Sequence, residues 1–154
     1  MASLLDGRNN VPLSDAQIQS VASTLFGLDK EVPFIYEPAS QTVFRVRMEA
    51  HEEICEIAYG PDIYPGTGIA NANSQLGMKG AVAHEICHFH RHRNLTELND
   101  ERLRHIDEAM TSLEAIGRFP RDLSDHDARE LAADALQRLR LFVQYFLATF
   151  PAEN

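Results

Sequence analysis

Apolar and charged residues alternate along two short stretches of the chain. Residues 42–49, TVFRVRME, place apolar side chains on one side and charged ones on the other, which is typical of a half-buried β-strand. Residues 54–60, ICEIAYG, show the same alternation over a shorter length. The charged link AHEE between them predicts a hairpin. A helix over 49–57 is the alternative, because Glu and Ala favour helices.

Apolar residues recur with a helical period elsewhere in the chain. Residues 15–27 follow Ser14 and carry Gln17 three positions after it, which is the capping-box pattern of a helix start. Three later segments show the same period and predict helices over about 78–91, 98–116 and 124–150.

The segment between the second strand and the second helix carries few apolar residues. Residues 61–68, PDIYPGTG, predict a loop because they are rich in Pro and Gly. Residues 69–76, IANANSQL, are short and polar, which predicts a third strand at the edge of the sheet. The strands and helices together predict the α+β class, with a single domain over residues 1–154.

The last two predicted helices each carry an apolar stripe that we expect to be buried. The stripe of the first consists of Leu103, Ile106, Met110 and Leu113. We expect it to pack on the final helix. The stripe of the final helix consists of Leu136, Leu139, Val143, Phe146 and Phe150. A partner surface is the alternative for this second stripe.

Composition narrows the class of protein. Hydrophobic residues make up 44% of the chain, no apolar run approaches the length of a membrane span, and the start, MASLLDGRNN, lacks a secretory pattern. The net charge of −9 argues against nucleic acid as a partner. Cys55 and Cys87 form no CxxC motif, which suits a reducing compartment, although one disulfide stays open. We therefore expect a cytoplasmic protein with no membrane or nucleic-acid partner.

The strongest chemical signal is HExxH, formed by His84, Glu85 and His88. Residues four apart project from the same face of a helix, so the two imidazoles are directed at a common point. This spacing lets one Zn²⁺ ion accept both nitrogens. Glu85 lies one residue round the helix, where it can act as general base toward a water on the metal.

A third ligand must come from another part of the chain, because a catalytic zinc site has three protein ligands and one open position. His92 shares the face of His88 but lies about 6 Å further along the helix axis, which disfavours it. The remaining candidates are Asp107, Glu108 and Glu114 on the next helix. Glu108 lies opposite the apolar stripe of that helix, among small residues that permit a close approach.

The spacing resembles that of the gluzincins, the thermolysin-like zinc peptidases. In that family nineteen residues separate HExxH from a ligand Glu in a segment NExxSD. Nineteen residues after His88 lead to Glu108, in the segment DEAMTS. Asp107 replaces the Asn, Thr111 replaces the Ser, and Ser112 stands where the family has an Asp that orients the first His. The match covers roughly residues 68–117.

The resemblance implies a zincin-like core. In such a core a small, mostly antiparallel sheet packs on the HExxH helix and two further helices follow. It implies one Zn²⁺ per chain, held by His84, His88 and Glu108, and a metallopeptidase that cleaves a protein or peptide substrate. The strand predicted over 69–76 would align that substrate.

Two questions stay open at this level. A peptidase needs a donor for the oxyanion, and the sequence does not choose among His126, Tyr59, Tyr64 and Tyr145. The alternative function is a zincin-like module that binds a protein without cleaving it. A helical protein in which HEICH arose by chance is the third hypothesis.

Overall fold

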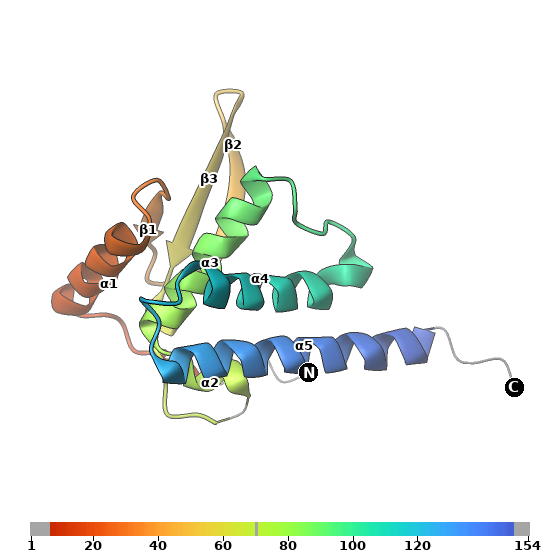
Figure 1. Ribbon diagram of the computed structural model, residues 1–154. Coiled ribbons are helices and arrows are strands. Elements are labelled where there is room, and N and C mark those ends of the chain that lie inside the picture. Colours follow the sequence, from red (N-terminus) through yellow and green to blue (C-terminus); the bar gives the residue numbers. More distant parts are fainter. Residues whose placement is uncertain (1–6, 70, 150–154) are drawn as a thin grey trace, which may run out of the picture.

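The computed structural model describes residues 7–69 and 71–149, which fold into an α+β structure with five α-helices and a three-stranded mixed sheet (Figure 1). Helix α3 lies between the sheet and the pair formed by α4 and α5. The elements are α1 Asp15–Leu28, β1 Phe34–Tyr36, β2 Val43–Glu49, β3 Glu52–Tyr59, α2 Ala72–Gln75, α3 Met78–Arg93, α4 Arg104–Arg118 and α5 Asp125–Thr149. Two 3₁₀ turns cover Pro61–Ile63 and Glu101–Leu103.

The predicted hairpin is confirmed. Strands β2 and β3 pair antiparallel from Glu49↔Glu52 to Val43↔Ala58. The two residues of the turn, Ala50 and His51, have φ angles of 49° and 68°. A two-residue turn with both residues left-handed matches the twist of paired strands, so the helix alternative over 49–57 is wrong.

The sheet contains a strand that the sequence did not predict. Strand β1 pairs parallel with β3, so the strand order is β1-β3-β2 and the sheet is mixed, with the longer pairing of β2 and β3 antiparallel. Three residues are too few to show a period. Pro33 lies just before β1, and its carbonyl accepts a hydrogen bond from the Ile57 N–H at 2.9 Å. Proline has no N–H to donate, and this pairing does not require one.

The predicted edge strand over 69–76 is wrong. In the described part of this segment, Ala72–Gln75 form the short helix α2. The Asn71 side chain accepts the Ser74 N–H at 3.1 Å, and the Ser74 hydroxyl accepts the Asn71 N–H at 3.2 Å. Asn at a helix start competes successfully with strand pairing because its side chain satisfies the free N–H groups. The free edge of the sheet beside α3 therefore belongs to β2.

The predicted helices are present, with one boundary wrong. Helix α1 begins at the capping box of Ser14 and Gln17 as predicted, and α3 and α5 lie where their periods place them. Helix α4 begins at Arg104 rather than at Leu98. The Asp107 carboxylate accepts the Leu98 N–H at 2.8 Å. This hydrogen bond holds the residues from Leu98 to Leu103 outside the α-helix.

The assignment of the two predicted apolar stripes to the core is wrong in part. Leu103 and Ile106 of α4 are half-buried, and the other described residues of the stripes are exposed. On α4 the residues with the smallest exposure are Ala109, Thr111, Ser112 and Ala115. The stripe residues Met110 and Leu113 are 42% and 51% exposed. Small side chains let two helices approach closely, so α4 packs through them rather than through its stripe.

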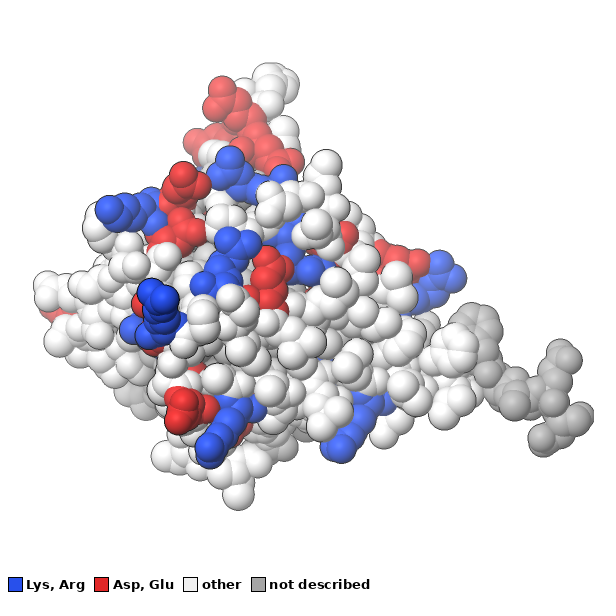
Figure 2. Space-filling view, viewed as in Figure 1, with Lys and Arg blue, Asp and Glu red and all other residues white. Residues whose placement is uncertain are grey.

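Helix α5 behaves in the same way. It buries Leu131 and Ala135 together with the charged residues Asp127, Asp134 and Arg138. The stripe residues Leu136, Leu139, Val143 and Phe146 are 40–52% exposed. Phe150 lies outside the described residues. Figure 2 shows the result, an extended surface along α5 that few charged side chains interrupt.

The segment before α1 is tied to the 3₁₀ turn Pro61–Ile63 and to α2 and the residue after it. The buried Arg8 guanidinium donates to the carbonyls of Asp62 and Ile63 at 2.8 Å, of Asn73 at 3.0 Å, and of Leu76.

A search of the helices in the described part of the chain for a membrane-spanning segment finds none with the required length and apolar character.

Candidate metal centre

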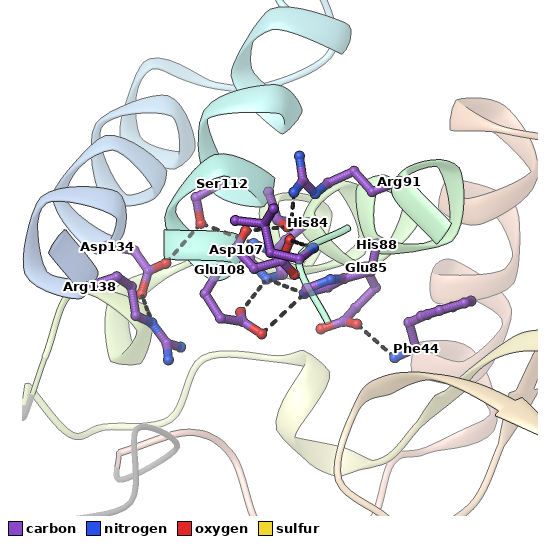
Figure 3. A network of polar contacts seen from close by, with 12 residues as sticks. Phe44, His84, Glu85, His88, Arg91, Asp107, Glu108, Ser112, Asp134 and Arg138 are labelled. Atoms are coloured by element: carbon purple, nitrogen blue, oxygen red, sulfur yellow. Dashed lines mark hydrogen bonds and ion pairs between the residues drawn. The ribbon is translucent and has the colours of Figure 1, made fainter. Parts of the chain in front are cut away.

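Three side chains from two helices converge beside the sheet (Figure 3). His84 and His88 project from one face of α3, and their Nε2 atoms lie 3.1 Å apart. Glu108 approaches from α4, with Oε2 3.2 Å from the His84 Nε2 and Oε1 3.5 Å from the His88 Nε2. The structure thus brings together the three residues that the sequence and the resemblance proposed as ligands.

The spacing of these atoms fits a tetrahedral metal ion. Zinc–nitrogen bonds of about 2.0–2.1 Å at tetrahedral angles place neighbouring ligand atoms roughly 3.3–3.4 Å apart. The separations of 3.1 Å between the two nitrogens and of 3.2 and 3.5 Å from each nitrogen to its nearer Glu108 oxygen bracket that value. Two unprotonated nitrogens and a carboxylate repel one another at this range, and a divalent cation removes that repulsion.

The electrostatics of Glu108 and His88 agree with this fit. Burial would raise the pKa of Glu108, but its hydrogen bonds with His84 and His88 outweigh burial and hold that pKa far below its ordinary value. Burial would lower the pKa of His88, but Glu108 and Glu85 raise it to about 9. Without a metal the site therefore stabilises bound protons, and a cation can take their place.

Helix α4 is held in the orientation that directs Glu108 at the histidines. The buried Arg91 guanidinium lies 2.5 Å from the Asp107 carboxylate, one residue before Glu108. Asp107, a candidate ligand in the sequence, therefore fastens α4 to α3 instead. Glu114, another candidate, lies 2.9 Å from Arg118 on its own helix and is not among the converging residues.

Glu85 lies beside the ligand triangle on the side of the sheet. Its Oε2 accepts the Phe44 N–H of β2 at 2.8 Å. Burial raises the pKa of Glu85 above its ordinary value, which increases its affinity for a proton. The carboxylate is thus fixed in position and suited to proton transfer.

A chain of polar contacts orients His84 from behind. The Ser112 hydroxyl lies 3.0 Å from the His84 Nδ1 and donates to the Asp134 Oδ2 at 2.8 Å. Because that hydroxyl gives its proton to Asp134, it accepts from a protonated Nδ1, which leaves the His84 Nε2 free for a metal. Asp134 is held in turn by Arg138, whose Nε lies 3.4 Å from Oδ1.

Sequence reasoning missed Asp134 and Arg138. The sequence of α5 did carry a signal for them. Asp134 and Arg138 follow Leu131 by three and seven positions, so they share the face of the helix that packs inward. The carboxylate that supports His84 belongs to Asp134 of α5, and it acts through the Ser112 hydroxyl.

The three residues open onto a cavity of about 360 Å³. The cavity is bordered on one side by the start of β2 and the residues before it, and on the other by α4 and α5. Its lining comprises Gln41, Thr42, Val43, Phe44, Asn73, His84, Glu85, His88, Arg104, Glu108, Asp134 and Arg138.

The other predicted candidates lie elsewhere. None of the four proposed oxyanion donors belongs to the cavity lining in the described part of the chain. The His126 Nε2 lies 2.7 Å from the Gln75 carbonyl, and the Tyr64 hydroxyl donates to the Gln17 carbonyl. Tyr59 is buried in the core, and Tyr145 is exposed.

Cys87 is buried as expected, and neither cysteine forms a disulfide.

Comparison of the chain with protein-family models, with curated proteins and with solved structures finds no match. The function therefore has to be argued from the geometry of the site.

Proposed function

We propose that the protein is a zinc-dependent metallopeptidase, in which His84, His88 and Glu108 bind the ion and Glu85 is the general base. One observation carries the proposal. Two imidazole nitrogens and one carboxylate lie 3.1–3.5 Å apart, close to the edge length of a zinc tetrahedron, and a second, separate carboxylate is held beside them by a main-chain N–H. A structural zinc site does not require a carboxylate beside its ligands, whereas a hydrolytic site requires one as the general base.

The residues divide the chemistry between them. A zinc ion bound here supplies a Lewis acid that polarises a carbonyl and lowers the pKa of water toward 7. Glu85 accepts the proton of the attacking water and passes it to the leaving amine. The Phe44 N–H keeps the Glu85 carboxylate from rotating away from the reacting atoms.

Strand β2 is suited to hold an extended peptide, the role first expected of residues 69–76. It lies at the edge of the sheet, and its first residues border the cavity. The Phe44 N–H donates to Glu85, so a peptide would pair with other main-chain groups of this edge. A peptide lying along this edge gains main-chain hydrogen bonds and passes beside the metal ligands.

A helix carrying HExxH between a sheet and an acid-bearing helix supports the zincin-like core that the gluzincin resemblance implies.

The test compares wild type with Glu85→Gln on a broad peptide library, with zinc content measured in both. We expect Glu85→Gln to retain zinc and to lose cleavage by about 10²–10⁴-fold, because the amide cannot accept the proton. The exposed Glu31 offers a matched control, and Glu31→Gln should cleave like wild type. Equal cleavage by Glu85→Gln and wild type would contradict the peptidase.

A second candidate function is a metal-binding module that holds a protein without cleaving it. It is favoured by the position of the four proposed oxyanion donors, which lie outside the cavity lining. Zinc bound in stoichiometric amount, together with no cleavage by wild type across the library, would select this function. Protein that binds no zinc would remove both functions and leave the HEICH segment as a structural helix.

A further inference from the structure

A second group of potential ligands lies at the C-terminal end of α3, where the β2–β3 hairpin contacts the last turn of the helix. Glu53 and Cys55 alternate along β3 and therefore share a face of the strand. The Glu53 Oε1 lies 2.7 Å from the His92 Nε2 and 3.4 Å from the Cys55 Sγ. The ligand atoms of all three residues lie within 4.8 Å of one another.

His92 is oriented as a metal-binding histidine is. Its Nδ1 lies 2.7 Å from the Glu97 Oε1. A carboxylate on one ring nitrogen fixes the proton there and leaves the other nitrogen as the ligand, which is the common arrangement behind histidines that bind metals. The ring is also held 5.6 Å from that of Phe44, measured between centroids.

The composition of the group indicates which metal it suits. Two carboxylates around an imidazolium account for Glu53, His92 and Glu97 as a surface ion pair. The half-buried Cys55 packs against the hydrophobic core and directs its thiol at the Glu53 carboxylate, which adds a sulfur to this group. One nitrogen, one sulfur and one oxygen form a donor set for zinc, whereas magnesium and calcium prefer oxygen alone. The two carboxylates also supply negative charge that favours a dication.

We propose that Glu53, Cys55 and His92 form a second zinc site, which fastens the β2–β3 hairpin to the end of α3. Cys55 binds as the thiolate, and its proton passes to solvent. The ion joins two segments that lie 39 residues apart in the chain. Strand β2 belongs to the same hairpin and contacts Glu85 through Phe44, so this ion also fixes the edge strand relative to HExxH. No residue of this site is a ligand of the first.

Cobalt provides the test, because a thiolate bound to Co²⁺ gives a charge-transfer band in the near ultraviolet and histidine or carboxylate ligands do not. The first centre contains no sulfur, so the band reports the second site alone. We expect the band in wild type titrated with Co²⁺, its loss in Cys55→Ser, and its retention in Cys87→Ala, the matched cysteine control. Zinc content should fall by one equivalent per chain in Cys55→Ser.

The outcomes separate the two sites. His88→Gln should lose the first ion and keep the thiolate band, so failure of the proposed peptidase leaves this test intact. His92→Gln should lose the band as Cys55→Ser does, which covers the case in which one variant does not fold. Absence of the band in wild type at saturating Co²⁺, or its persistence in Cys55→Ser, would overturn the second site and leave only an ion pair.

Discussion

At the scale of single residues, the orientation of His84 depends on a hydroxyl that both accepts and donates. Ser112 and Asp134 are each buried, and each has a hydrogen-bond partner within the network. A buried polar chain of this kind is rigid when every member is satisfied, and it weakens as a unit when one member is lost. Through Ser112, the Asp134 carboxylate on α5 therefore fixes the orientation of His84 on α3.

We predict that Ser112→Ala and Asp134→Asn each weaken zinc binding at the first centre by about 10–100-fold, because the His84 ring loses its orienting partner. Titration against a chromophoric chelator measures this affinity. Thr111→Val is the matched control, since the Thr111 hydroxyl donates to a carbonyl of its own helix at 2.8 Å. Affinities that do not change in either variant would remove Ser112 and Asp134 from the support of the site.

At the scale of helices, α4 and α5 meet through small and polar side chains and leave apolar ones outside. Ser112 and Ala115 permit a close approach of the helix axes. Asp134 gains Ser112 as a partner in that contact, and Arg138 pairs with Asp134 on its own helix. The polar network of the site thus decides which face of each helix is buried. An apolar period alone does not carry that information.

This arrangement predicts opposite results for two leucines of α5. Leu131 is fully buried and Leu136 is 50% exposed. Leu131→Ala should lower the free energy of unfolding by about 2–5 kcal/mol, because it leaves a cavity in the core. Leu136→Ala should lower it by less than about 1 kcal/mol. Urea unfolding of both variants measures the difference, and equal losses would show that the outer stripe is buried.

At the scale of the whole molecule, one contact ties α1 to the helix that carries the site. The Asp29 carboxylate, at the end of α1, lies 2.5 Å from the His90 Nε2 on α3. Burial would raise the pKa of Asp29, but the hydrogen bonds with His90 and the Glu31 N–H, together with nearby positive charge, hold that pKa below its ordinary value of 3.8. The contact therefore stabilises the fold only while Asp29 is ionised.

The sign of the pH dependence follows from this direction. A depressed carboxyl pKa contributes stability above the unfolded value of 3.8 and loses it as the pH falls through the lower, folded value. Near pH 7 we expect Asp29→Asn to lower the free energy of unfolding by about 1 kcal/mol, and this difference should shrink at acidic pH below 3.8. Urea unfolding of both proteins across pH measures it, with Asp122→Asn as an exposed control. A difference that stays constant with pH would contradict the role of the charge.

The sequence predicted those parts of the fold and site that depend on near neighbours. The hairpin, the capping box at Ser14 and the shared face of His84 and His88 were all local patterns, and the structure contains each of them. Strand β1 was missed because its three residues form a strand only by pairing with β3. The strand over 69–76 was wrong because the side chain at Asn71 satisfied the backbone before any neighbouring strand could.

By itself, the sequence determined the helix that carries HExxH and the side of that helix on which both imidazoles lie, because four residues make about one turn whatever surrounds them. Only the tertiary structure decided that Glu108 meets those imidazoles, that Asp134 supports His84 through Ser112, and that β2 is the edge beside Glu85. These contacts join segments 22 to 41 residues apart. Over such separations the partner is chosen by the packing of helices and sheet, which no local period specifies.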